Sequence, residues 1–206
     1  MIKNTDSIKG FNRPKTKVGI TKMNKLIEVA EKLFTSKGFY QTSISDICKA
    51  AGTAVGTFYI YFDSKTDIYY YMMVSYEKEI KHRLADAIKD LNTRYEKERE
   101  GIKCFIKYAV ENPNVYNIIW GSLSVDRQLF INYYESFAKS YAKAIAQHSD
   151  EITVSDTTTI AYMLMGISNF LGLRAMFEEM TEDQINKLVD ETLMHALSSG
   201  IFKSTP

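Results

Sequence analysis

The sequence predicts an all-α protein, with an N-terminal three-helix domain of the helix-turn-helix type and a larger C-terminal helical domain. Apolar residues recur every three or four positions through most of the 206 residues, and no segment alternates as a strand would. Residues 38–65 hold two very short helical patterns separated by Gly52. A hydrophobic content of 45% with 25% charged residues is typical of a globular protein with a real core.

The charge is distributed unevenly along the chain. Residues 1–65 hold 11 Lys or Arg against 5 Asp or Glu, a net charge of +6, whereas residues 66–206 hold 15 against 20, a net charge of −5. A compact basic segment favours contact with a phosphate backbone. The acidic remainder argues against an architectural protein that coats DNA without an effector. A chance asymmetry of the surface is the alternative.

Residues 1–19 are predicted to form a basic flexible arm, because Lys and Arg are mixed with Gly and Pro and show no sustained period. Such an arm can follow phosphates or reach a minor groove, and it can equally be a solvated tail. The first helix carries an apolar stripe from Leu26 to Phe34 and ends at Gly38 as a C-terminal cap. Residues 20–64 are the predicted DNA-binding domain.

The first short helix of the helix-turn-helix is predicted to begin after Ser43. Asp46 follows three residues later, which makes a capping box, and Ile44 and Ile47 begin an apolar stripe. Gly52 supplies the permissive backbone of the turn.

The second short helix is predicted to start near Ala54, with Phe58 and Phe62 facing inward. Hydroxyl and aromatic side chains on its outer face suit phosphates and base edges. That outer face holds Val55, Thr57, Tyr59 and Tyr61.

At these residues the chain resembles the tetracycline-repressor (TetR) family of bacterial transcription regulators. Two departures occur: Cys48 stands where alanine is usual, and Thr53-Ala54-Val55 replaces Val-Ser-Lys or Val-Ser-Pro. Cysteine is small and apolar, so close packing of the helices is retained. The residues that match the family pattern are Leu33-Phe34, Gly38-Phe39, Thr42-Ser43-Ile44, Ala51-Gly52, Gly56-Thr57-Phe58-Tyr59, Phe62 and Lys65.

The resemblance implies a homodimeric repressor that binds a near-palindromic double-stranded DNA operator through the major groove. We expect Thr57, Tyr59 and Lys65 to hold phosphates, and Val55 and Tyr61 to lie nearest the base edges. The complete set of expected DNA contacts is Ser43, Thr53, Ala54, Val55, Thr57, Tyr59, Tyr61 and Lys65.

Residues 65–206 are the predicted effector-binding and dimerisation domain. Ser64 and Asp67 open a long helix at about 65–91, which continues without Gly or Pro. Further helices are expected at about 95–111, through Trp120, and at about 124–147, 155–178 and 182–199.

The last two predicted helices differ in character. The helix at 155–178 is apolar nearly all round, so it needs cover on more than one side, whereas the final helix has one apolar face. Gly166 and Gly172 would permit a close neighbour. In the resembled family these helices form a four-helix bundle across a dimer axis; a central helix of a monomer is the alternative. The expected interface residues are Leu164, Leu171, Leu188, Leu193 and Leu197.

Aromatic and methionine side chains in the middle helices suggest an apolar pocket, although such stripes also make ordinary core. Asn169 and Arg174 interrupt an otherwise apolar helix, and a buried Arg needs a carboxylate from a ligand or from the protein, such as Asp126 or Glu135. We therefore predict a small lipophilic effector, for which an acidic group and a purely structural salt bridge of Arg174 are the two alternatives. The expected ligand contacts are Tyr108, Trp120, Tyr133, Phe137, Met163, Asn169, Phe170 and Arg174.

An enzyme is the competing class, and little supports it. His82, His148 and His195 lack metal-ligand spacing, no phosphate-binding glycine loop follows a strand, and Gly121-Ser122-Leu123-Ser124 is not preceded by a strand. The sequence therefore predicts no catalytic residue, no metal and no cofactor.

The sequence also predicts a cytoplasmic protein without a membrane contact. Cys48 and Cys104 each lie in an apolar helical pattern, which favours free thiols over a disulfide. The opening residues carry no apolar run typical of a secretory signal. The longest apolar stretch, 160–177, is interrupted by Asn169 and Arg174 and is predicted to be a buried core helix.

Overall fold

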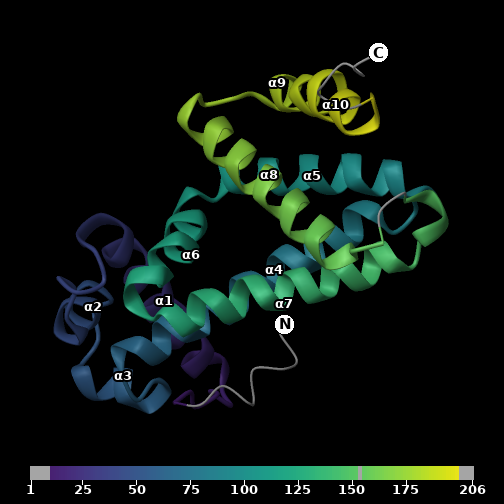
Figure 1. Cartoon of the computed structure of the whole chain (residues 1–206). Helices are drawn as coiled ribbons and strands as arrows, with labels where there is room; N and C mark the ends of the chain where they lie inside the picture. Colours follow the sequence, from purple (N-terminus) through teal and green to yellow (C-terminus); the bar gives the residue numbers. More distant parts are fainter. Residues whose placement is uncertain (1–9, 153–154, 200–206) are drawn as a thin grey trace. The chain divides into compact units, whose positions relative to one another are not determined.

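The computed structural model describes residues 10–152 and 155–199, and helices account for most of this part of the chain (Figure 1). The only strand-like feature among these residues is one antiparallel bridge between Phe11 and Phe62. The helices in chain order are α1 (Lys17–Lys37), α2 (Ile44–Ala50), α3 (Val55–Tyr61), α4 (Lys65–Ile88), α5 (Arg94–Glu111), α6 (Pro113–Val125), α7 (Arg127–Ala146), a 3₁₀ turn η1 (Ser149–Glu151), α8 (Thr157–Phe177), α9 (Glu182–Lys187), a π-helical segment η2 (Leu188–Leu193) and α10 (Met194–Ser199).

The predicted all-α fold is confirmed, and the predicted helices are found close to their expected ends. The final predicted helix runs through α9, η2 and α10, and its middle is π-helical. The capping boxes at Ser43 and Thr181 are present, and Gly38 caps α1. Short-range signals therefore set the ends of these helices.

The chain forms two compact units. The first unit comprises Met1–Glu79 and Asn114–Tyr134, and the second comprises Ile80–Pro113 and Glu135–Pro206. The predicted boundary at residue 64 therefore does not coincide with a unit boundary. Helix α4 contributes its first fifteen residues to the first unit, and α6 returns to that unit.

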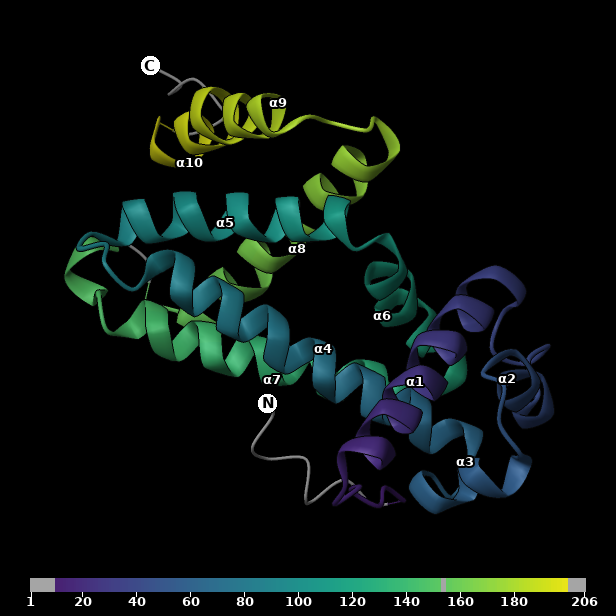
Figure 2. The same cartoon turned by 180° about the vertical axis from the view of Figure 1, so that it is seen from behind.

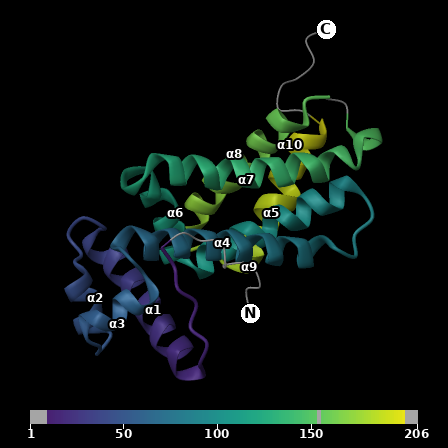
Figure 3. The same cartoon turned by 90° about the horizontal axis from the view of Figure 1, so that it is seen from below.

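The core of the first unit joins the three N-terminal helices to the start of α4 (Figure 3). Tyr69 of α4 is almost fully buried, and its hydroxyl donates a hydrogen bond of 2.5 Å to the Ile118 carbonyl of α6. The pKa of the Tyr69 phenol is raised well above its usual range by burial. Fully buried side chains of this core include Leu26, Ile47, Phe58, Phe62, Ile68 and Met72.

The second unit is built on the packing of α5 against α8 (Figure 2). Gly172 makes this approach possible, because a Cβ atom there would lie 3.3 Å from the Cβ atom of Ala109. Gly166 has open space around its Cβ position, so only one of the two predicted close-packing glycines has this role within the chain. One apolar cluster fastens α9, η2 and α10 to this pair and comprises Ile102, Ile106, Ala175, Ile185, Val189 and Met194.

Candidate functional site

The helix-turn-helix of the first unit is fixed by local hydrogen bonds. Ser43 accepts a hydrogen bond from the Asp46 N–H, and the Asp46 carboxylate accepts one from the Ser43 N–H. These bonds hold the pKa of the Asp46 carboxyl below its usual value. Gly52 has a φ of +66°, and the Thr53 N–H donates to the Cys48 carbonyl over 2.9 Å. The sequence signals for this turn are therefore confirmed in its geometry.

The two short helices pack through small and aromatic side chains. Cys48 of α2 and Phe58 of α3 are both buried, and burial raises the pKa of the Cys48 thiol. A buried cysteine in place of alanine is thus accommodated while α2 and α3 remain closely packed.

The outer face of α3 is apolar and aromatic. Val55 is 43% exposed, Tyr59 51% and Ile60 60%, while Thr57 is half-buried. Ile60 was missed in the sequence analysis. Its exposure follows from the helical period, since it lies two residues after the buried Phe58 and points to the opposite side.

The expected contact between Tyr61 and the base edges is wrong, because Tyr61 is only 4% exposed. It follows Phe58 by three residues and shares its inward face. A Cβ atom at Gly19 of α1 would lie 3.6 Å from the Tyr61 hydroxyl. Tyr61 therefore lies on the inner face of α3 beside α1, and the exposed large side chains of α3 are Val55, Tyr59 and Ile60.

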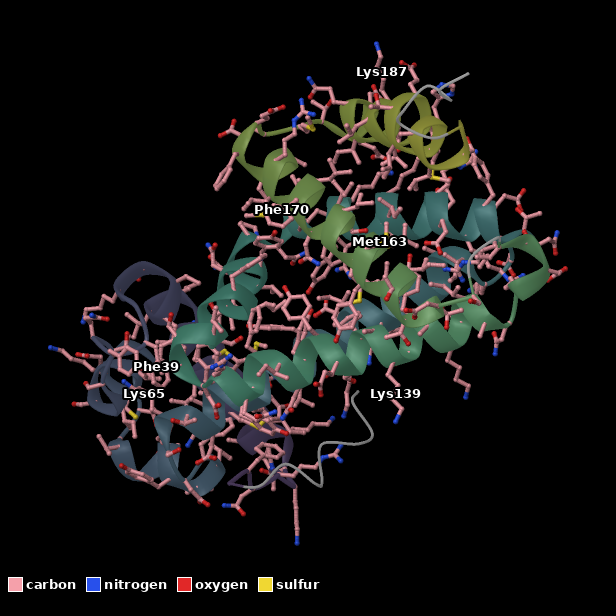
Figure 4. The ribbon with its side chains drawn as sticks, in the orientation of Figure 1. Phe39, Lys65, Lys139, Met163, Phe170 and Lys187 are labelled. Carbon is pink, nitrogen blue, oxygen red and sulfur yellow. The ribbon has the colours of Figure 1, made fainter. Side chains whose placement is uncertain are left out.

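The expected role of Lys65 also needs correction. Its Nζ donates to the Phe39 carbonyl over 2.6 Å and to the Thr42 carbonyl over 2.7 Å, and it lies 4.3 Å from the centroid of the Phe39 ring (Figure 4). Burial lowers the pKa of this ammonium. Two of its three N–H groups are thus used to hold the segment between α1 and α2, which gives Lys65 a structural role in the first unit.

The described part of the predicted arm is attached to the helix-turn-helix. The Asn12 N–H donates to the Tyr61 carbonyl over 2.8 Å, and the Asp63 N–H donates to the Gly10 carbonyl over 3.1 Å. The Phe11 ring lies 4.6 Å from the Tyr71 ring, centroid to centroid. From residue 10 onward the predicted arm is therefore docked on the end of α3, and residues 1–9 lie outside the described part.

Exposed basic side chains occur on the segments that neighbour α3. The arm and α1 present exposed Arg13, Lys15, Lys17 and Lys22, and Lys49 is exposed at the end of α2. Cations flanking an exposed short helix supply the positive potential that a phosphate backbone requires.

The eight predicted effector contacts belong to different units. Trp120 and Tyr133 lie in the first unit, and the other six lie in the second. Within the first unit Trp120 joins an aromatic cluster, with ring centroids 6.2 Å from those of both Tyr116 and Phe130. Burial raises the pKa of the Tyr116 phenol. In the second unit Tyr108 is buried beneath the Arg83 guanidinium, and Phe137 is half-buried under the Lys81 ammonium.

The expectation of a buried Arg174 is wrong. Arg174 is exposed on α8, and its Nε donates to the Glu178 carboxylate over 2.9 Å. That hydrogen bond raises the pKa of the guanidinium and lowers the pKa of the Glu178 carboxyl. The partner is one helical turn away, so neither Asp126 nor Glu135 is needed. Asn169 is also satisfied locally, since its Nδ2 donates to the Met165 carbonyl.

Helix α8 carries an exposed apolar stripe. Met163 is 60% exposed and Phe170 65%, and the two lie on the same face of the helix (Figure 4). Tyr162 and Phe177 are exposed beside them. Within a single chain this face of the predicted buried core helix is therefore uncovered. Among the described residues α8 is also the one helix long and apolar enough to cross a membrane, a property shared with core helices of soluble proteins.

The predicted interface leucines have mixed surroundings. Leu164 is buried against Ile145 and Ala161, and Leu171 and Leu193 pack on the cluster of the second unit. Leu188 is half-buried, and Leu197 is exposed. Leu164 is therefore a core residue, and the exposed stripe of α8 is the better candidate for a contact with another chain.

Two side-chain polar atoms of α4 are buried without a hydrogen bond to any described residue. Ser75 Oγ and Lys78 Nζ are shielded from solvent, and no hydrogen-bond partner for either occurs among the described residues. Elsewhere in residues 10–152 and 155–199, no group of His, Cys, Asp and Glu side chains is arranged to hold a metal ion. Both cysteines in this part of the chain are free thiols.

Comparisons with known proteins agree with the geometry of the first unit. Residues 26–72 match the model of bacterial regulatory proteins of the tetR family. The chain is 52% identical over 44 residues to the HTH-type transcriptional regulator YvdT of Bacillus subtilis, covering 21% of this chain and 23% of that protein. It is 33% identical over 76 residues to a fatty acid metabolism regulator protein of the same organism, covering 37% and 39%. The chain thus matches well under half the length of these two relatives.

Solved structures extend the similarity to nearly the whole chain. A putative TetR-family transcriptional regulator from Syntrophomonas wolfei superposes with a TM-score of 0.76 at 20% identity, covering 90% of this chain and 99% of that one. The regulator FadR from Bacillus subtilis, solved in complex with stearoyl-CoA, superposes with a TM-score of 0.72 at 22% identity, covering 87% and 99%. At these identities the superpositions establish a shared fold.

Proposed function

We propose that this protein, whose residues 26–72 belong to the tetR family of bacterial regulatory proteins, is a dimeric repressor that binds a near-palindromic DNA operator and leaves it when a small lipophilic effector binds. The observation that carries the proposal is the outer face of α3. Val55, Tyr59 and Ile60 project from a short helix that follows a glycine turn, and basic residues flank it. This is the arrangement by which a helix-turn-helix places a few side chains against base edges.

The effector part of the proposal rests on the aromatic and apolar content of the helices that follow. A relative of similar fold was solved with stearoyl-CoA bound, which supports a lipophilic ligand for this chain. Helix α4 is continuous from Lys65 to Ile88 and contributes to both units, so it offers a mechanical link. Release needs the effector to prefer the non-binding state by about a hundredfold, roughly 2.7 kcal/mol.

The homodimer is supported by the exposed stripe of α8. A single short recognition helix binds DNA weakly, and two copies at half-sites about 34 Å apart, or a multiple of this, give usable affinity. An exposed row of large apolar side chains is unusual on a monomer and suits a second copy of the same chain.

The DNA-binding proposal is tested with DNA from upstream of the protein's own gene. Fluorescence anisotropy should give a saturable, sequence-dependent affinity. Tyr59→Ala should weaken operator binding by about 1–3 kcal/mol and narrow the gap between operator and scrambled DNA. Tyr70→Ala is the matched control, since Tyr70 is an exposed tyrosine of α4 in the same unit. Equal affinity for operator and scrambled DNA in the parent protein would instead support an architectural role.

A further inference from the structure

Ser75 and Lys78 form an unsatisfied polar pair on one face of α4. They lie three residues apart, so their side chains are neighbours on the helix surface. Ser75 Oγ and Lys78 Nζ are both shielded from solvent without a hydrogen-bond partner among the described residues. A buried ammonium without a partner is costly, and native proteins rarely retain one without a reason.

Other enclosed lysines of this chain have partners. Lys81, one turn further along α4, donates to Ser136 Oγ over 2.9 Å and to Ser140 Oγ over 3.2 Å. Lys103 of α5 donates to the Asp190 carboxylate over 2.8 Å. Since the same fold satisfies these ammonium groups, the isolation of Lys78 is a local property of its position on α4.

We infer that Ser75 and Lys78 bind the anionic group of the effector, a carboxylate or a phosphate. An anionic oxygen can accept one hydrogen bond from the ammonium and one from the hydroxyl, and the opposite charge compensates the buried cation. The inference rests on the proposed effector response and narrows it to lipophilic anions. It also replaces Arg174, whose guanidinium is paired with Glu178 at the surface.

A lysine that binds the effector and a lysine that only supports the fold should affect stability in opposite directions. Without ligand, Lys78 places an uncompensated charge in the folded protein, so its removal should stabilise the fold. With ligand, the same charge contributes to binding, so its removal should weaken binding. A lysine that only supports the fold would lower stability when removed and leave ligand binding unchanged.

The test compares Lys78→Met with Lys81→Met, two like substitutions on one helix. The probes are palmitate, palmitoyl-CoA and, as an uncharged match, hexadecanol. Thermal melting without probe reports how much each ammonium stabilises or destabilises the folded protein. Binding of each probe is measured by Trp120 fluorescence and by the shift in Tm that the probe causes. Operator release by the probes in the parent protein is measured separately, so failure of the effector model is distinguished from failure of the anion site.

Lys78→Met should raise the Tm of the ligand-free protein by about 2–4 °C. It should weaken binding of the charged probe at least about tenfold and bring it close to that of hexadecanol. Lys81→Met should lower the Tm and should leave the affinity for each probe within about twofold of that of the parent protein. Preference for palmitate identifies the carboxylate as the anion, whereas preference for palmitoyl-CoA identifies the phosphates.

Ser75→Ala provides a second variant with little risk to folding. It should lower the affinity for the charged probes by about threefold to tenfold and leave the affinity for hexadecanol unchanged. A lower Tm or failure to fold in Lys78→Met would overturn the inference, because the ammonium would then have a structural partner. Unchanged binding of both charged probes in Lys78→Met would overturn it as well.

Discussion

The helix-turn-helix of the first unit and the α5–α8–α9 core of the second unit are stabilised by different kinds of interaction. In the helix-turn-helix the polar contacts are short in sequence, such as the capping box at Ser43 and the turn at Gly52. In the second unit they join distant segments: Lys103 pairs with Asp190, and Lys107 pairs with Glu182. Local hydrogen bonds thus define the geometry of the helix-turn-helix, and contacts between segments distant in sequence define the second unit.

The difference predicts that charge deletion is most damaging in the second unit. Arg94 is buried at the start of α5, its guanidinium pairs with the Glu98 carboxylate, and the Tyr141 hydroxyl donates to the same carboxylate. Burial, followed by the nearby Glu98, raises the pKa of the Tyr141 phenol well above its usual range. This cluster connects α5 to α7.

Arg94→Met should destabilise the protein by about 3–5 kcal/mol, because it leaves the Glu98 carboxylate enclosed without its cation. Urea unfolding followed by circular dichroism measures the effect. Arg99→Met is the control, since Arg99 is more than a third exposed in its ion pair with Glu100 and should cost about 1 kcal/mol or less. Equal losses in the two variants would contradict the distinction between enclosed and exposed pairs.

The exposed stripe of α8 gives the second test, which compares a residue of the stripe with an exposed apolar residue outside it. Phe170→Glu places a charge on the stripe and should raise the dimer dissociation constant at least about a hundredfold, or roughly 2.7 kcal/mol. Sedimentation velocity over a concentration series measures it. Leu123→Glu is the control, because Leu123 is an exposed apolar residue of α6 in the first unit. A Phe170→Glu protein that stays dimeric at nanomolar concentration would exclude this face.

Most of the fold could be predicted from the sequence because its signals are local. The apolar periods, the Ser43 cap and the Gly38 cap specify helices whose ends the structure reproduces. The π-helical turn at Leu188–Leu193 carried no such signal. It lies in the stretch that packs on α5, where Val189 is buried and Asp190 pairs with Lys103, so it depends on contacts distant in sequence.

The candidate site was predicted less completely, because several of its side chains are positioned by contacts distant in sequence. The outward positions of Val55 and Tyr59 follow from the helical period, but Tyr61 was assigned to the wrong face. The carbonyl partners of Lys65 lie 23 and 26 residues away, so no local pattern indicates that its ammonium is engaged. Lys78 could not be distinguished from Lys81 by any pattern, since only the tertiary structure shows which of the two has partners.

The smallest expected effect concerns Lys49 at the end of α2 and Lys65 at the start of α4. It tests whether a lysine that stabilises the helix-turn-helix can be distinguished from one that contacts DNA. Lys65→Met removes an ammonium that donates to two backbone carbonyls, so the free energy of unfolding should fall by about 1–3 kcal/mol. Lys49 is exposed at the end of α2, so Lys49→Met should change stability by less than about 0.5 kcal/mol.

For DNA binding the order should be the opposite: Lys49→Met should have the larger effect and Lys65→Met the smaller. Lys49→Met should lower the slope of log affinity against log salt by about one contact, on operator and scrambled DNA alike, because a phosphate contact carries no sequence information. Lys65→Met, measured at a temperature where it is fully folded, should leave that slope unchanged, since its ammonium is directed at the backbone behind α2. If Lys65→Met instead reduced the salt slope and left the unfolding free energy intact, its ammonium would have to leave the Phe39 and Thr42 carbonyls when DNA binds. The interface would then be assembled on the operator, and the local bonds of the first unit would describe only the DNA-free protein.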